Sequence, residues 1–156
     1  MSEPRFVSGA PAPLFERLTD VDPDVDAEAQ PLRMLPPAVL RQSVARELDR
    51  LLNTRAPVAA DILAARARST IDYGIPDLSL FGPRDFDSET RLIQALRQAI
   101  ETYEPRLANP RVRVERDARQ NGALIVHVDG DLRLGSMIEP ISFAVSVHGT
   151  GESHGE

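Results

Sequence analysis

The side chains that could hold a metal ion are few and scattered along this chain of 156 residues. It has no cysteine and only three histidines, His127, His148 and His154. A protein metal site needs several such ligands close together. Asp129-Gly130-Asp131 supplies two carboxylates without the remainder of a calcium-binding loop, so we interpret it as a turn. We therefore expect no metal and no other cofactor.

Acidic residues are numerous, but their spacing does not single out a catalytic pair. A glycosidase needs two carboxyl groups about 5–9.5 Å apart across a cleft, one of them with a raised pKa. Glu104 with Asp129 or Glu139 could be proposed, yet nothing in the sequence pairs them. The Gly-x-Ser-x-Gly pattern occurs at residues 151–155, but it lies in the polar tail and not at a strand-to-helix turn, so no serine occupies a nucleophile elbow. All 18 basic residues are arginine, which excludes Schiff-base lysine chemistry. We assign no catalytic residue.

One tripeptide stands out, Glu104-Pro105-Arg106, which lies between apolar Tyr103 and Leu107. It is open to two interpretations. The two charges could be solvated at the surface end of a helix. Alternatively the segment is buried, in which case each charge must be matched by an opposite charge or by backbone groups. The arginine fork suits bidentate pairing with a carboxylate, and Pro105 fixes the local backbone direction. In the second interpretation we expect a poorly solvated junction shared with a partner.

The net charge of −6 is unevenly distributed. Residues 1–30 carry two arginines and seven carboxylates, a net −5, so the other 126 residues are almost neutral. Neither part has the basic stripe of a nucleic-acid-binding protein or a polybasic membrane patch. No apolar run approaches the ~18 residues that cross a bilayer. We expect no nucleic acid partner and no direct membrane insertion.

Proline and aspartate dominate residues 1–36, which we expect to form an extended acidic N-terminal arm. Within it, residues 13–18 contain a short apolar turn, because Leu14, Phe15 and Leu18 share one helical face. Two roles stay open for this turn: a docking peptide for a partner, or a segment that packs onto its own domain. At the other end, residues 149–156 are predicted to be a flexible tail.

The middle of the chain has two strong helical patterns. Apolar residues at helical spacing predict a helix from the proline pair at 36–37 to about Asn53, and another from about 85–88 to Tyr103. Residues 58–68 could be helical and 69–72 extended. The loop Tyr73-Gly74-Ile75-Pro76-Asp77 is predicted to be structural, with Gly74 at positive φ and Pro76 stiffening the turn.

From residue 112 onward the apolar residues alternate as in strands. Asn121-Gly122 predicts a hairpin turn, and a second turn is expected near 129–131. The fold class is therefore α+β: helices followed by a small, mainly antiparallel sheet of three or four strands. We expect this single domain to span residues 37–148.

Three short segments, in order, resemble a known family. They are Leu51-Leu52-Asn53-Thr54-Arg55, residues 67–77 (ARSTIDYGIPD), and Tyr103-Glu104-Pro105-Arg106-Leu107. Together they are similar to the TssE family of type VI secretion baseplate subunits, which are phage-baseplate sheath initiators once labelled "lysozyme-like". The resemblance covers about residues 12–148. The acidic stretch at 20–30 and the tail after Val147 depart from it.

The resemblance implies a non-catalytic, structural baseplate wedge subunit of a contractile injection machine. Its implied partners are other wedge subunits and sheath subunits, in a hetero-complex where the sheath begins to assemble. The implied location is the cytoplasm, in a baseplate docked at the inner membrane complex. Glu104, Pro105 and Arg106 would be the family motif and would bind a partner, and strands of neighbouring chains would extend the sheet. A peptidoglycan-cleaving, lysozyme-like hydrolase is the alternative.

Overall fold

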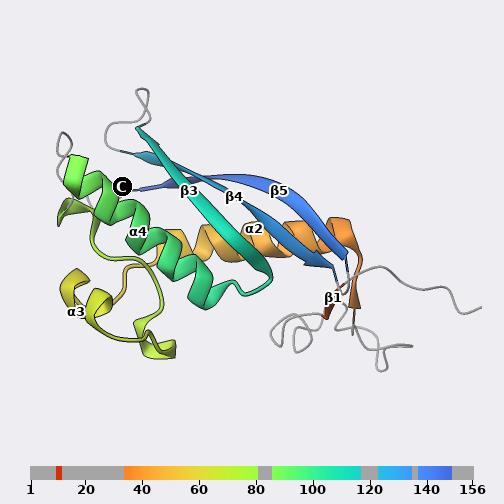
Figure 1. Ribbon diagram of the computed structural model, residues 1–156, viewed down its shortest axis with the longest axis horizontal. Helices are drawn as coiled ribbons and strands as arrows, with labels where there is room; N and C mark the ends of the chain where they lie inside the picture. The colour runs from red at the N-terminus through yellow and green to blue at the C-terminus, as the bar shows by residue number, and fades with distance from the viewer. Residues whose placement is uncertain (1–9, 12–33, 81–85, 117–122, 135–136, 149–156) are drawn as a thin grey trace, which may run out of the picture.

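The computed structural model describes residues 10–11, 34–80, 86–116, 123–134 and 137–148. Two long helices, α2 (Pro37–Asn53) and α4 (Phe86–Tyr103), cover one face of a three-stranded antiparallel sheet of order β3-β4-β5 (Figure 1). The strands are β3 (Leu107–Arg116), β4 (Leu124–Leu134) and β5 (Met137–Val147). The predicted α+β class is confirmed, and the sheet has three strands.

The core lies between the two helices and the sheet. On α2 every residue of the predicted apolar stripe is buried: Leu40, Val44, Leu48, Leu51 and Leu52. On α4 the buried residues include Leu92, Leu96 and Ile100. The strands contribute alternate residues, as in β4, where even-numbered positions from Leu124 to Leu134 are buried. This alternation puts polar residues such as His127 and Asp129 on the opposite face of the sheet.

Residues 58–72, which the sequence left ambiguous, form two short turns of helix. These are α3 (Ala60–Ala65) and the 3₁₀ turn η1 (Thr70–Asp72). The extended conformation considered for 69–72 is found only at Ser69, because Ser69 and Asp72 form a capping box on the turn at 70–72. The Ser69 N–H and hydroxyl both donate to Asp72 Oδ2, at 2.9 and 3.0 Å. A second 3₁₀ turn, η2 (Leu78–Leu80), follows.

The turn expected at Asp129-Gly130-Asp131 is wrong, since β4 runs through these residues without interruption. Gly130 is required there for a different reason. A Cβ at Gly130 would stand 2.9 Å from the Leu107 side chain and 3.0 Å from the Ala108 carbonyl oxygen. The glycine therefore lets β3 approach closely rather than turning the chain. The Asn121-Gly122 hairpin lies outside the described residues.

A two-stranded ribbon precedes α2. β1 (Ala10–Pro11) pairs antiparallel with β2 (Met34–Leu35), so Pro11 lies opposite Met34. Leu35 is buried in the main core. The ribbon therefore places Pro11 beside Met34, just before the start of α2. The apolar turn at Leu14, Phe15 and Leu18 and the tail 149–156 lie outside the described residues.

In the part of the chain that the structure describes, no helix is long and apolar enough to cross a membrane.

Candidate functional site

Glu104 is buried, Arg106 is half-buried, and the two side chains are paired with each other. The Arg106 Nε donates to Glu104 Oε1 at 2.6 Å, and the Arg106 Nη2 donates to Glu104 Oε2 at 2.5 Å. The exposed fraction of the side chain is 3% for Glu104 and 17% for Arg106. A bidentate pair of this kind satisfies both charges where water is scarce. The sequence interpretation with two solvated charges is therefore excluded by the geometry.

This pair also connects the helices to the sheet. The Arg106 Nη1 donates to the hydroxyl of Ser43 on α2 at 2.8 Å, and Ser43 is itself buried. The Arg106 carbonyl accepts the N–H of Arg133 on β4 at 3.0 Å. Glu104 directly follows α4, and its carbonyl accepts the Leu107 N–H that starts β3. The side chain of Arg106 thus joins the end of α4 to α2, and the backbone carbonyls of Glu104 and Arg106 join it to β3 and β4.

Of the three residues in this motif, Pro105 is the most accessible. Pro105 is exposed, whereas Glu104 is buried and Arg106 is half-buried. A buried charge at Glu104 or Arg106 was expected to need an opposite charge, and each of the two residues supplies it for the other. A partner that approaches this junction would therefore meet Pro105 and the edge of the Arg106 guanidinium first.

The segment Asn53-Thr54-Arg55 fastens the end of α2 to the end of β5. Asn53 Nδ2 donates to the Ser146 carbonyl at 3.1 Å, and the His148 N–H donates to Asn53 Oδ1 at 3.3 Å. The Arg55 guanidinium donates to the His148 carbonyl. Burial lowers the pKa of Arg55, and the charge of Asp77 partly opposes that shift. These contacts fix the outer strand β5 against the helices.

The loop that contains Gly74 lies against the same segment. Gly74 has φ +115°, so the predicted positive φ is confirmed. The Ile75 N–H donates to the Thr54 carbonyl at 2.9 Å, and the Ala56 N–H donates to the Ile75 carbonyl at 2.8 Å. A side chain at Gly74 would collide with the Thr54 oxygen, at 2.6 Å from its Cβ. Pro76 is buried and Asp77 is exposed in this loop.

A second arginine–carboxylate pair holds the preceding turn. Arg66 donates to both oxygens of Asp72, at 2.7 and 2.8 Å, and Asp72 is fully buried. Hydrogen bonds from Arg66 and from Ser69 lower the pKa of Asp72 to about 2. The Tyr103 hydroxyl donates to the Ser69 carbonyl at 2.6 Å, and the Tyr103 ring meets the Tyr73 ring edge-on. This turn is thereby joined to the end of α4.

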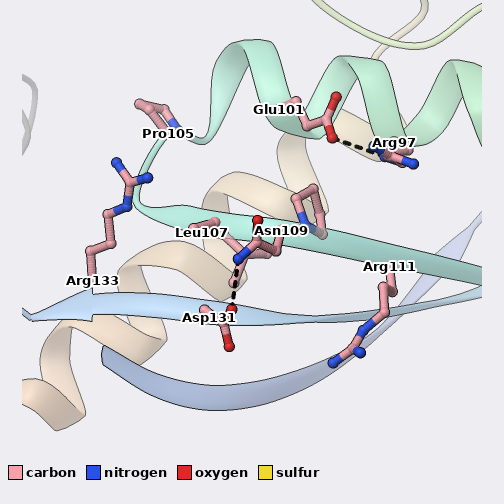
Figure 2. A pocket seen from close by; sticks show the side chains of 10 residues that line it. Arg97, Glu101, Pro105, Leu107, Asn109, Arg111, Asp131 and Arg133 are labelled. Carbon is pink, nitrogen blue, oxygen red and sulfur yellow. Dashed lines mark hydrogen bonds and ion pairs between the residues drawn. The ribbon is translucent and has the colours of Figure 1, made fainter. Parts of the chain in front are cut away.

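Beside Pro105 the surface is hollowed, and arginines surround the hollow (Figure 2). Its volume is about 580 Å³, and we call it the arginine hollow. Its charged and amide side chains are those of Arg97, Glu101, Asn109, Arg111, Asp131 and Arg133. Figure 2 shows Arg133 from β4 extending toward Pro105, with Arg111 from β3 on the other side of Asn109 and Asp131.

The carboxylates considered for glycosidase chemistry each have their own partner. Glu104 is paired with Arg106, and Glu139 forms an ion pair with Arg41. Asp129 accepts hydrogen bonds from Ser142 at 2.5 Å and from Arg113 at 3.0 Å, which lower its pKa. A general acid needs its pKa shifted in the opposite direction. This geometry does not assemble a catalytic pair from these three residues.

The histidines are not brought together. His127 Nε2 lies 3.4 Å from a carboxylate oxygen of Glu115 on the exposed face of the sheet. His148 directly follows β5, and His154 lies outside the described residues. Across the described ranges, no three His, Asp or Glu side chains are close enough together to hold a metal ion.

Several residues of this site were missed by sequence reasoning. Ser43 carried a usable signal, since it lies three residues after Leu40 on the apolar face of α2, and a buried hydroxyl needs a partner. Arg133 and Asn109 had no comparable signal. Their positions in the arginine hollow depend on how β3 pairs with β4, which no local pattern specifies.

Comparison with known proteins adds three findings. A family model described as "Baseplate wedge protein gp25" matches residues 38–136, more than half of the chain. A search of curated protein sequences returns no match. A chain in a solved structure titled "The baseplate complex from the type VI secretion system" is 18% identical, with a TM-score of 0.47. That alignment covers 71% of this chain and 96% of the other.

Proposed function

Because the chain belongs to the gp25 family of baseplate wedge proteins, we propose that it is a wedge subunit of a type VI secretion baseplate on which the sheath begins to assemble. The family relationship inferred from three short motifs is confirmed, and with it a structural role in a baseplate. The finer statements, namely which subunits it contacts and that it initiates the sheath, are the proposal.

The observation that carries the proposal is the family match over residues 38–136. This range runs from α2 through β4 and contains all three motifs. Each motif makes contacts that hold the domain together: Asn53 to β5, the capping box of Asp72 to α4, and Arg106 to α2 and β4. A rigid scaffold that presents strand edges is what a structural subunit needs.

We propose that the outer edge of β5 accepts a strand from a sheath subunit. Within the described residues, β5 pairs on one side only, with β4. An unpaired edge is a template for strand addition by another chain. Ile138, near the start of β5, is 68% exposed, and its neighbour Met137 is also exposed, so this end of the strand presents apolar surface. A hollow of about 520 Å³ lies next to this strand, between Phe143 and Ala45 of α2, and could receive a partner side chain.

A second proposed contact is the junction at Glu104, Pro105 and Arg106. We propose that another wedge subunit packs on exposed Pro105, while the buried pair beneath sets its position.

The apolar turn at Leu14, Phe15 and Leu18 remains a proposed docking peptide. The proposed setting is a cytoplasmic baseplate docked at the inner membrane complex, in a hetero-complex with wedge and sheath subunits.

The test is co-purification of wedge and sheath subunits with affinity-tagged chain. Wild-type chain should retain both. Ile138→Asp should lose the sheath subunit without a change in melting temperature, because the substitution puts a charge on the proposed interface. Ile62→Asp is the matched control, since Ile62 is also exposed but lies on α3. The proposal is contradicted if wild-type chain retains neither class of subunit. Equal retention of the sheath subunit by Ile138→Asp would remove β5 as the contact.

A further inference from the structure

We propose that the arginine hollow binds the chain's own acidic segment, residues 20–28, within the same molecule. The proposal does not depend on the function proposed above. It combines the charges of the hollow, the composition of the segment, and the distance between the hollow and the β1–β2 ribbon.

Two arginines of the hollow have unused binding capacity. Arg97 is engaged by Glu101 at 2.9 Å, and Asp131 accepts a hydrogen bond from Asn109 at 2.9 Å, as the dashed lines in Figure 2 show. The Arg97–Glu101 pair is neutral, but Asn109 carries no charge, so Asp131 stays negative beside Arg111 and Arg133. Three arginines against two carboxylates give the hollow a net charge of +1. Neither the Arg111 nor the Arg133 guanidinium has a hydrogen bond or ion pair with any other residue that the structure describes. An arginine fork is well suited to carboxylate oxygens.

The backbone opens this hollow through an irregularity in β3. The register between β3 and β4 shifts between Ala108 and Arg111. Asn109 within the shift has φ 50°, the left-handed conformation that asparagine tolerates better than most residues. A bulge of this kind bends its strand and redirects side chains. Here Asn109 and Asp131 lie between Arg111 and Arg133 (Figure 2), so the two arginines lie on either side of them.

The acidic segment matches the hollow in charge. Residues 20–28 contain Asp20, Asp22, Asp24, Asp26 and Glu28 and no basic residue. Five carboxylates so close together repel one another, and nearby cations relieve that repulsion. Arg111 and Arg133 form no ion pair with a described carboxylate, although the charge of Arg111 helps to lower the pKa of Asp129.

The segment can also reach the hollow. The β1–β2 ribbon holds residues 11 and 34 side by side, and Figure 1 shows β1 at the end of the molecule where α2 begins. Asp26 is eight residues from Met34, a span of up to roughly 27 Å for an extended chain. An upper limit to the distance between Leu35 and the hollow follows from a path of bonded atoms. This path runs along the first two turns of α2 to Ser43, then through Arg106 to the backbone of Arg133. Its summed length is on the order of 30 Å. The straight distance is shorter, so the carboxylates come within reach.

The test exploits the absence of lysine from the sequence. A single lysine is introduced into the full chain as Arg133→Lys or Arg111→Lys, and a carbodiimide joins its amine to any carboxylate in direct contact. Only the N-terminal amine competes. Arg91→Lys is the matched control, because Arg91 is exposed on α4 outside the hollow. Mass spectrometry of the monomer then identifies the carboxylates that reacted.

We expect isopeptide bonds between the introduced lysine and residues 20–28. Their yield should be roughly tenfold above the Arg91→Lys control, the factor that about 1.4 kcal/mol of binding preference gives. Added salt should lower the yield, because it screens exposed charges. A yield at the hollow no higher than the control would overturn the proposal. Cross-links found only in covalent dimers would overturn it too, since the segment would then bind a second copy.

Discussion

Removal of the Arg106 guanidinium should destabilise the domain far more than removal of an exposed arginine. Arg106→Ala leaves the Glu104 carboxylate, whose side chain is 3% exposed, without its cation. Breaking a buried pair in this way costs about 3–5 kcal/mol. Because the Arg106 side chain is 17% exposed, some water can replace it, so we expect the lower end of that range. Arg106→Lys should lose less, since an ammonium keeps the charge but cannot form the fork.

The chain offers a matched control in Arg113, which pairs with Asp129 at 3.0 Å but has a side chain that is 71% exposed. Arg113→Ala should cost no more than about 1 kcal/mol. Urea unfolding followed by circular dichroism measures both free energies of unfolding. A double-mutant cycle on Glu104 and Arg106 should give a coupling of roughly 2–3 kcal/mol. If Arg106→Ala and Arg113→Ala lowered the free energy of unfolding by the same amount, our view of the motif as an internal connection between helices and sheet would be wrong.

Three further outcomes are expected. Gly74→Ala should lower the melting temperature, because φ +115° is strained for alanine and its Cβ would collide with the Thr54 oxygen; an unchanged melting temperature would mean that the loop relaxes freely. Asp72 has a folded pKa of about 2, below its ordinary value, so it should stabilise the fold fully above about pH 4 and lose that effect as the pH falls toward 2. The stability difference between wild type and Asp72→Asn should therefore shrink over that window in urea titrations, and a constant difference would contradict the assignment. Purified chain should release no soluble fragments from peptidoglycan, since the candidate carboxylates are ion-paired; hydrolysis abolished by one carboxylate substitution would favour the hydrolase alternative.

Local patterns predicted the elements whose stability depends on one buried face. Several residues carry the same signal in each case, namely the apolar stripe from Leu40 to Leu52 and the alternating apolar residues of β4 and β5. One residue that departs from the pattern therefore does not change the prediction. The structure agrees with both. The positive φ of Gly74 was also predicted from local residues, because a glycine two residues before a proline is typical of a turn.

Features that depend on contacts between distant residues were not predicted. Gly130 looked like part of a turn, but its role is to let Leu107 of the neighbouring strand approach. The sequence allowed an extended conformation for residues 69–72, but the side chains of Ser69 and Asp72 cap a 3₁₀ turn. Burial of Glu104 and Arg106 was one of two possibilities, because spacing alone does not reveal burial, and their pairing with each other was not predicted.

The central claim, that this chain is the baseplate subunit on which the sheath begins, is tested most directly in cells. Sheath assembly is followed by fluorescence microscopy of a tagged sheath subunit in cells that lack this chain. We expect no sheaths in those cells, and full recovery when the wild-type chain is supplied. Sheaths that assemble at normal frequency and length without the chain would contradict the account.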